Sequence, residues 1–424
     1  MATHGLSLKV MKTGSSKSTL IVGAGVAGLA TALAFQHRGW DVQVVERAVA
    51  LREIGAGIQL SPNGMKVLRA LGLEDAILQR GFLPEALEMR MGRSGFPIFC
   101  LPIKSAAQYR WRAPYVHIHR ADLIDVLSQA LEERAPGCVR LGATVEGLDR
   151  DGKGLFLQGG ERLNANVVIA ADGLRSTLRS AAFGPQPARF TGMTAWRATV
   201  PVAALRSDAP PPTACVWAGP GRHVVSYYVA RGQVANFVGV VEKDVSDPEA
   251  MESWRGVHGT GAQIAEALDD FAGWDPTIIR MIQASQGLCQ WALFDRPPST
   301  QWVSGKMALV GDAAHPMLPT FAQGASQGLE DAWTVATLVD GNDSVEDGLN
   351  RYASLRQPRT RAVQQRAMRN AHDFHHQPGF EQIRAYSTLF FGGRVLPWMA
   401  RGRLDEIYRY DAVAEAEAAV ASAV

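Results

Sequence analysis

The amino-acid sequence predicts an α/β fold in which a parallel sheet is interrupted by an inserted antiparallel sheet and followed by helices. Three apolar runs, near residues 19–22, 166–173 and 306–315, each end in a turn that contains Gly or Asp. Residues 185–295 instead hold short β-branched and aromatic runs separated by Gly, Pro and Arg. From residue 323 onward, apolar residues recur at helical spacing.

The first βαβ unit lies near the N-terminus. Residues 19–22 are β-branched and apolar, which is typical of a strand buried on both faces. Residues 27–38 have apolar residues at helical spacing, and Gly39 is placed to end that helix. A second buried strand is predicted at 42–45, which completes the unit.

The rest of the chain supplies the later strands and the helices. The runs "NVVIAADG" and "KMALVGDAAH" predict two more buried strands, and "RHVVSYYVA" is typical of an antiparallel sheet. Helices are expected over 323–339 and 345–375. The predicted division is a flexible leader at 1–18, a parallel-sheet domain at 19–184 and 296–345, a β-rich substrate domain at 185–295, and a C-terminal helical segment at 346–424.

Composition and charge limit the classes of partner. Of the 424 residues, 47% are hydrophobic and 20% are charged, as in ordinary globular proteins. The 43 Lys and Arg against 41 Asp and Glu give a formal net charge of +2, which gives no electrostatic case for nucleic acid or an anionic membrane surface. No apolar run reaches about 18 residues, so we expect no membrane span. The 4 cysteines have no CxxC or zinc spacing, which fits reduced thiols and a cytoplasmic location.

The turn after the first strand reads "GAGVAG", residues 23–28. Gly23 allows a tight turn, Gly25 lets the backbone approach a pyrophosphate, and Gly28 lets the helix pack against the strand. Glu46, at the end of the second strand, can accept hydrogen bonds from ribose hydroxyls. The motif predicts a dinucleotide site at a helix N-terminus, and the alternative is an ordinary turn with a surface glutamate.

Two later turns are expected at the same edge of the sheet. "ADGLRS" occupies 171–176, and "GDAAHPMLPTFAQGASQGLEDA" occupies 311–332. Asp312 can accept from ribityl or ribose hydroxyls, and Pro316 and Pro319 stiffen the following loop. The "AQGAS" stretch presents backbone N–H groups that can stabilise negative charge on the N1–C2=O edge of a flavin. Because ligands lie beyond the carboxyl ends of strands in doubly wound sheets, the three turns are expected to converge on one ligand.

Together these motifs resemble those of the single-component FAD-dependent aromatic hydroxylases, the para-hydroxybenzoate hydroxylase-like flavoprotein monooxygenases, over about 19–415. The chain looks most like the salicylate hydroxylase and 3-hydroxybenzoate 6-hydroxylase branch, whose tail signature is similar to "YRYDAVAE". The resemblance implies a Rossmann-like FAD-binding domain of the GR2 type that encloses the substrate domain. It implies FAD contacts from Gly23, Gly25, Gly28, Glu46, Arg47, Arg120, Val145, Asp172, Asp312, Gln323, Gly324 and Ala325.

The resemblance also implies a reaction. A small hydroxyaromatic acid, salicylate-like, would be hydroxylated with NADH or NADPH and O2 through a flavin C4a-hydroperoxide. No second GxGxxG motif occurs, so the nicotinamide is expected to dock transiently on the FAD-binding face. Pro319 is expected to lie against the flavin. The protein must shield the site from water and draw off a phenol proton.

The candidate catalytic and substrate residues lie mainly on the β-rich layer. His223 and Tyr227 are four apart on a predicted strand, so they share a face and could relay a proton or orient a carboxylate; a structural role is the alternative. Gln59 and Trp217 are expected to contact the substrate, and a core role is the alternative for Trp217. Gln59 stands where, by the resemblance, the hydroxynicotinate branch has histidine, which disfavours a pyridine substrate.

Other features bear on metals and on alternative functions. "HDFHH" at 372–376 has a spacing seen in metal sites, but its place in the C-terminal segment favours a solvated helix end, and we expect no metal. Thr320 stands where related sequences often carry an aromatic residue. The alternatives are a hydroxynicotinate or other N-heteroaromatic hydroxylase, a non-oxygenating flavoprotein oxidoreductase, and a non-enzymatic FAD-fold binder of a partner protein. A homodimer is left open.

Overall fold

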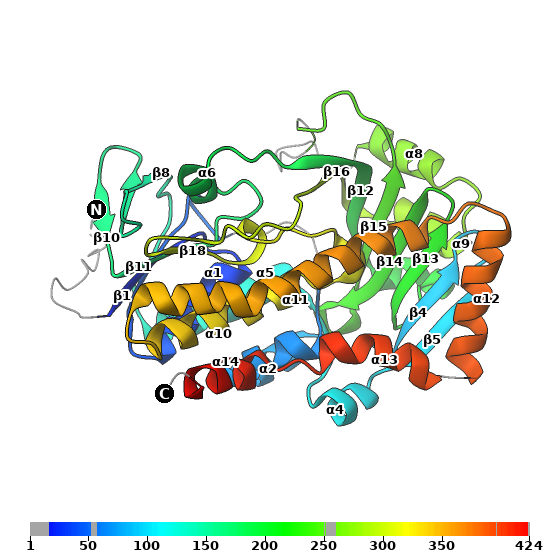
Figure 1. Cartoon of the computed structure of the whole chain (residues 1–424). Helices are drawn as coiled ribbons and strands as arrows, with labels where there is room; N and C mark the ends of the chain where they lie inside the picture. The colour runs from blue at the N-terminus through cyan, green and yellow to red at the C-terminus, as the bar shows by residue number, and fades with distance from the viewer. Residues whose placement is uncertain (1–16, 52–56, 250, 252–259, 396, 423–424) are drawn as a thin grey trace.

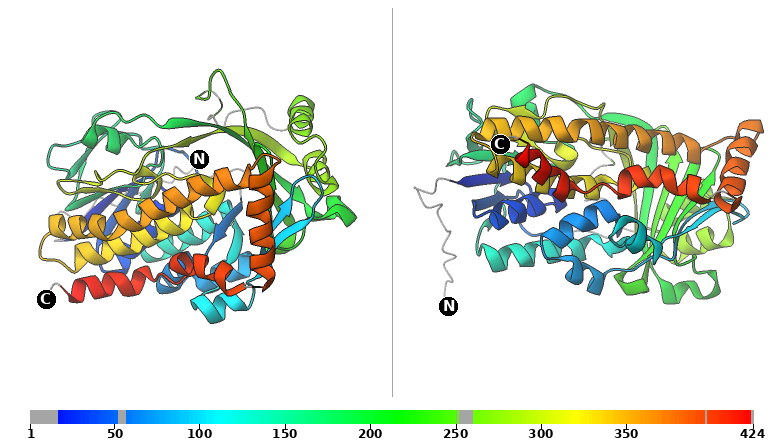
Figure 2. Two further views of the ribbon diagram at one scale, coloured as in Figure 1. Left: turned by 45° about the vertical axis from the view of Figure 1, so that its right-hand side comes forward. Right: turned by 60° about the horizontal axis from the view of Figure 1, so that its bottom comes forward.

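Two large sheets organise the chain, and the computed structural model describes residues 17–51, 57–249, 251, 260–395 and 397–422. The parallel sheet and the largely antiparallel sheet of the predicted substrate domain, called the substrate sheet from here on, lie at opposite ends of the molecule. The long helix α11 (Val345–Phe374) runs past both (Figures 1 and 2). Most of the predicted leader, residues 1–16, lies outside the described residues. The first strand begins at Ser18.

The parallel sheet is built as the apolar runs predict. Its neighbouring strands are parallel except for the edge pair of β17 and β18. All four residues of β11 are buried, because helices cover the sheet. In order across the sheet the strands are β17 (Val303–Ser304), β18 (Met307–Leu309), β11 (Val167–Ala170), β1 (Ser18–Val22), β2 (Asp41–Val45) and β7 (Val139–Arg140).

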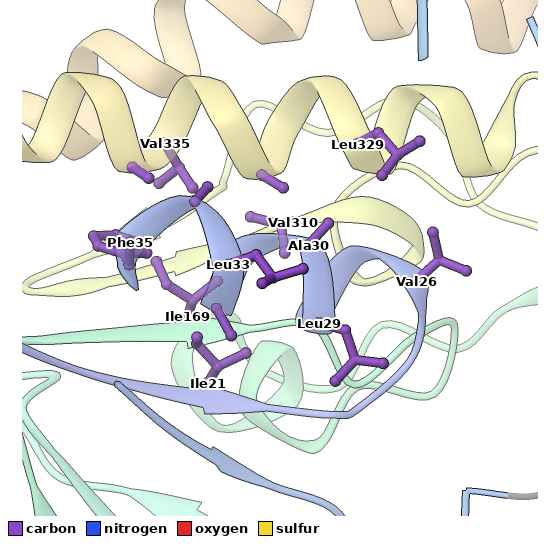
Figure 3. Close-up of a cluster of buried hydrophobic side chains, with 14 of the residues drawn as sticks. Ile21, Val26, Leu29, Ala30, Leu33, Phe35, Ile169, Val310, Leu329 and Val335 are labelled. Atoms are coloured by element: carbon purple, nitrogen blue, oxygen red, sulfur yellow. The ribbon is translucent and has the colours of Figure 1, made fainter. Parts of the chain in front are cut away.

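The main core lies where helix α1 is enclosed between the sheet and helix α10 (Figure 3). Helix α1 spans Val26–His37, and α10 spans Gly324–Asp340. Nine of the twelve residues of α1 are buried, so this helix has no solvent face of the usual width. The side chains gathered around it include Ile21, Leu29, Leu33, Phe35, Ile169, Val310, Leu329 and Val335.

The substrate sheet has seven strands and extends beyond the predicted 185–295 segment. Strands β4 and β5 come from the first part of the chain and add an edge, with β4 parallel to β13 and the other pairs antiparallel. Such a long-range pairing leaves no local signal in the sequence. The order is β16 (Gln286–Asp295), β12 (Arg189–Pro201), β15 (Val234–Glu242), β14 (Arg222–Val229), β13 (Ala214–Gly219), β4 (Ala86–Met91) and β5 (Pro97–Pro102).

The two faces of this sheet have different surroundings. On one face Trp196, Val224 and Phe237 join a second core with helices α8 (Gly261–Asp270) and α9 (Pro276–Gln283). The opposite face is turned toward the parallel-sheet domain. Because strand side chains alternate, each strand contributes both to this second core and to the space between the domains.

The remaining elements connect and cover these layers. No described helix is long and apolar enough to cross a membrane, and the described residues contain no group of three potential metal ligands. Helix α14 packs on α10 and α2. The other bounds are β3 (Gly57–Leu60), β6 (Val116–His119), β8 (Val145–Leu148), β9 (Gly154–Leu157), β10 (Arg162–Asn164), α2 (Pro62–Ala70), α3 (Glu74–Arg80), α4 (Ala106–Trp111), α5 (Arg120–Arg134), α6 (Thr177–Phe183), α7 (Val202–Leu205), α12 (Phe380–Val395), α13 (Pro397–Tyr408) and α14 (Ala412–Ala421).

A buried ion network ties α11 to α10 and to the turn after β18. The guanidinium of Arg356 donates to Glu330 (2.5 Å) and to Asp331 (2.8 Å), and all three side chains are 0% exposed. Asp331 also bonds His315 (2.5 Å) and accepts from the backbone N–H of Gly311 (2.9 Å). Burial alone would raise the pKa of Asp331, but His315 and Arg356 hold it below its ordinary value.

We expect Arg356→Met to lower the free energy of unfolding by about 3–5 kcal/mol at pH 7, because two buried carboxylates lose their shared cation. The pKa values of Glu330 and Asp331 are held low in the folded protein, so their stabilising contribution is lost as the pH falls through them. The difference from wild type should therefore shrink as the pH falls below the ordinary pKa values of these groups, 4.5 for Glu330 and 3.8 for Asp331.

Urea unfolding at pH 7 and at about pH 3, below the ordinary pKa values of both carboxyl groups, measures both effects. The exposed Arg361 on the same helix supplies the matched control, and Arg361→Met should change the free energy by less than about 0.5 kcal/mol. Equal losses in the two variants would contradict the structural role of the network.

Candidate active site

A cavity of about 570 Å³ lies at the carboxyl ends of β1, β11 and β18. Residues 22–27, 171–173 and 311–312, from the three turns that follow these strands, all contribute to its wall. The expected convergence of the three turns is therefore confirmed. Side chains from β12, β14 and β15 close the other end of the same cavity, so it joins the two domains.

The three glycines of the first turn have different surroundings. Gly23 has a φ of +100°, and a Cβ there would overlap the carbonyl oxygen of Ala171. A Cβ on Gly28 would overlap the carbonyl oxygen of Gly23, which fits a helix-packing position; Gly28 does not line the cavity. A Cβ on Gly25 would meet nothing within 4 Å, because this residue faces the open cavity.

Glu46 lies beside this turn and is already engaged by the backbone. Its two carboxylate oxygens accept hydrogen bonds from the N–H groups of Ala24 and Ala48, each at 2.8 Å. Glu46 thus braces the glycine turn, and its remaining lone pairs are open to the cavity that it lines. Arg47, the next residue, also lines the cavity.

An aspartate that lines the cavity occupies each of the other two turns. Burial raises the pKa of Asp172, against the hydrogen bonds from Ser176 and from backbone N–H groups. Its Oδ1 is buried without a partner among the described residues. Burial also raises the pKa of Asp312, opposed by His315 and Arg120. Both residues line the cavity, where carboxylate oxygens can accept hydrogen bonds from hydroxyl groups of a ligand.

Of the cofactor contacts predicted near the starts of α5, β8 and α10, four residues line the cavity and one does not. Arg120, at the start of α5, and Val145, at the start of β8, line the cavity, as do Gly324 and Ala325 at the start of α10. Gln323 does not appear in the cavity wall. Its buried side chain instead donates to Ser61 and accepts from Asn63, at 2.9 and 3.1 Å, so the expected cofactor contact of Gln323 stays a prediction for its backbone.

The end of the cavity next to the substrate sheet, where substrate is expected, brings together His223, Tyr227, Gln59 and Pro319. Gln59 accepts from the hydroxyl of Tyr115 at 2.8 Å, which leaves its amide NH2 to donate elsewhere. Burial raises the pKa of Tyr227, so its hydroxyl keeps its proton at neutral pH. The shared face of His223 and Tyr227 follows the predicted strand alternation.

Trp217 does not reach the cavity, which corrects its prediction as a substrate contact. It pairs across the sheet with Val224, on the face opposite His223, and both side chains join the second core. Its indole N–H donates to Ser226 at 3.0 Å. The assignment failed because one step of strand register decides which face a side chain occupies.

Arg197 is a cavity residue that the sequence reasoning missed. It lies on β12 opposite Val238, which also lines the cavity, and its Nε is buried without a partner among the described residues. Burial lowers its pKa, and Tyr227 is close enough to oppose that shift. An arginine inside the otherwise uncharged run "TAWRATV" was the available signal.

The end of this cavity that lies beyond the strands of the parallel sheet fits FAD. The space over Gly25 and the neighbouring helix N-terminus suit a diphosphate, and the unpartnered Oδ1 of Asp172 suits a hydroxyl. We expect Gly25→Ala to fold with an unchanged melting temperature but to bind FAD at least about 10-fold more weakly, because the added methyl occupies cofactor space.

Gly28→Ala supplies the comparison, since its methyl strikes backbone rather than cavity. That variant should lose about 1–3 kcal/mol of stability. Titration of the apoproteins with FAD, followed by flavin fluorescence, and thermal melts by circular dichroism measure the two effects. A Gly25→Ala protein that melts early, or that binds FAD normally, would contradict this division of roles.

Comparisons with known proteins agree with this site. The FAD binding domain family matches residues 16–367. The 3-amino-4-hydroxybenzoate 2-monooxygenase PtnB3 of Streptomyces platensis is 38% identical over 366 residues, which cover 85% of this chain and 89% of the relative. The 3-hydroxybenzoate 6-hydroxylase 1 of Aquipseudomonas alcaligenes is 33% identical, with 81% of this chain and 86% of the relative covered.

A solved structure extends the likeness to three dimensions. A substrate complex of salicylate hydroxylase matches with a TM-score of 0.75 at 26% identity, covering 95% of this chain and 97% of the other. The resemblance found in the sequence motifs is thereby confirmed, with the GxGxxG turn and both aspartate turns in one cavity. The chain belongs to the FAD-binding-domain family and is a flavoprotein aromatic monooxygenase.

Proposed function

We propose that the protein hydroxylates a small benzoate that bears a phenolic hydroxyl group. FAD is its cofactor, and NADH or NADPH and O2 are its co-substrates. The observation that carries the proposal is Arg197. A guanidinium enclosed in a cavity wall is costly unless an anion pairs with it, and its planar fork matches a carboxylate. An aromatic acid supplies that carboxylate.

On this proposal, the substrate also carries a phenolic hydroxyl group, which lies away from the carboxylate that Arg197 binds. His223 and Tyr227 line the same end of the cavity, and Tyr227 is close enough to Arg197 to influence its pKa. A neutral imidazole can accept a phenol proton, and the Tyr227 hydroxyl can donate to the phenolate that results. The free amide NH2 of Gln59 is a further donor for a polar ring substituent.

The cavity wall also protects the reacting atoms. FAD, once reduced by NADH or NADPH, supplies the reaction with O2 that delivers an oxygen atom to the ring. Val225, Val238, Met317 and Leu318 line the cavity and exclude water from it. Pro319, at the start of the 3₁₀ turn Pro319–Phe321, is proposed to lie against the flavin ring.

The names of the relatives narrow the substrates worth testing. The two relatives described above are named for 3-amino-4-hydroxybenzoate and 3-hydroxybenzoate. A further relative, 32% identical over 74% of this chain, is the 6-hydroxynicotinate 3-monooxygenase of Pseudomonas fluorescens. These acids and salicylate form the panel, each tested with NADH and with NADPH. Oxidation of the nicotinamide and incorporation of oxygen from ¹⁸O2 are followed together. A protein that oxidises NADH but puts no ¹⁸O into any of these acids would instead support a non-oxygenating oxidoreductase.

We expect Arg197→Met to lower kcat/KM for the preferred acid by about 10- to 100-fold, mainly through a higher KM, since a charged hydrogen bond is lost. For the corresponding phenol without a carboxylate, kcat/KM should fall much less. Arg189→Met is the matched control, since Arg189 lies on the same strand but has a side chain that is 62% exposed. This variant should leave kcat/KM unchanged for both substrates. Equal losses for acid and phenol would show that Arg197 does not bind the carboxylate.

A further inference from the structure

A chain of three side chains leads from the cavity to the surface. His223 lines the cavity, and its Nδ1 lies 2.7 Å from Nε2 of His375, the residue that caps the C-terminal end of α11. Nδ1 of His375 lies 2.7 Å from Oε1 of Glu242 at the end of β15. The His375 side chain is 3% exposed, and that of Glu242 is 54% exposed. We propose that His375 and Glu242 carry protons between His223 and solvent.

The contacts define one arrangement of hydrogen atoms. An ionised carboxylate only accepts, so Nδ1 of His375 carries hydrogen and donates to Glu242. Nε2 of His375 then has a lone pair and accepts from Nδ1–H of His223. The remaining nitrogen of His223, Nε2, is left with a lone pair for the cavity. The network therefore presents a base to the substrate.

The surroundings keep both imidazoles neutral, which a relay through them requires. Burial lowers the pKa of His223 well below its ordinary value, and His375 lowers it further. Burial also lowers the pKa of His375; Glu242 opposes this shift, and His372 and Arg222 add to it. A neutral imidazole donates from one nitrogen and accepts at the other, so it can pass a proton along without leaving its place.

The transfer balances and rests on the proposed phenolic substrate. The phenol O–H bond breaks as Nε2–H of His223 forms, and Nδ1–H of His223 breaks as Nε2–H of His375 forms. Nδ1–H of His375 breaks as Oε1–H of Glu242 forms, and this carboxyl releases its proton to water. Nothing is oxidised or reduced. The reverse sequence returns a proton to the product oxygen and restores the starting tautomers.

Two amide variants separate proton transfer from hydrogen bonding. His375→Gln keeps a polar side chain between the two partners, and Glu242→Gln keeps the shape of the terminal acceptor, but neither amide takes up and releases a proton. Arg369→Gln, which replaces an exposed side chain six residues before His375 on α11, is the matched control. Each FAD-loaded protein is mixed with 3-amino-4-hydroxybenzoate, and phenolate absorbance and release of protons to an indicator dye are recorded by stopped flow.

We expect His375→Gln to slow both signals by about 100-fold, with substrate affinity changed much less. Glu242→Gln should slow them to a smaller extent and should move the ionisation of the bound phenol to higher pH, because the final carboxylate no longer stabilises charge along the network. Arg369→Gln should match wild type. Wild-type rates in both His375→Gln and Glu242→Gln would overturn the proposal. If His375→Gln fails to retain FAD, the surface variant Glu242→Gln decides alone.

A second measurement needs no substrate. In ¹⁵N-histidine NMR spectra of the FAD-loaded protein, the proposal requires His223 and His375 to carry hydrogen on Nδ1. A His223 protonated on Nε2 would overturn it. A wild-type protein with the required tautomers that hydroxylates none of the panel would instead contradict the proposed function.

Discussion

The close approach of bare backbone around the first turn of α1 is the constraint on which the site depends. A Cβ on Gly23 would overlap the carbonyl oxygen of Ala171, so the ends of β1 and β11 meet only because no side chain separates them. Added Cβ atoms on Gly311 and Gly328 would lie 2.9 and 3.1 Å from the Cβ of Ala27. The turn after β18 and the start of α10 therefore press on the same helix, and the cavity is the space left beyond these contacts.

The buried ions behind this junction hold it in register. Asp331 accepts from the backbone of Gly311 and pairs with Arg356, so one carboxylate joins the turn after β18 to α11. The same α11 ends at His375 against the substrate sheet. One helix thus connects the wall of the cofactor end with the wall of the substrate end.

The cofactor end could be predicted from the sequence because its determinants are local. Gly23, Gly25 and Asp312 sit in turns directly after apolar strands, so their places follow from the strands alone. The substrate end depends on facing and register. His223 was placed by counting along one strand, whereas the direction of Trp217 depends on its pairing with Val224.

The residues that were missed depend on contacts that are distant in sequence. His375 belongs to "HDFHH", which we expected to be a solvated helix end; it is instead buried against His223, 152 residues earlier. Strands β4 and β5 were missed for the same reason, because β5 pairs with β4 and β4 pairs with β13, which lies more than 100 residues later in the sequence. Periodicity describes how one element is buried, but not which element covers it.

Lys66 fastens the chain between α13 and α14. Its ammonium group donates to the carbonyl oxygens of Arg409 (2.7 Å) and Tyr410 (3.0 Å), and the following Ala412 and Ala416 are fully buried. Helix α14 packs against α2 and α10, and the first residues of α10 line the flavin cavity. Removing α14, which does not itself line the cavity, would therefore weaken flavin binding through its contact with α10.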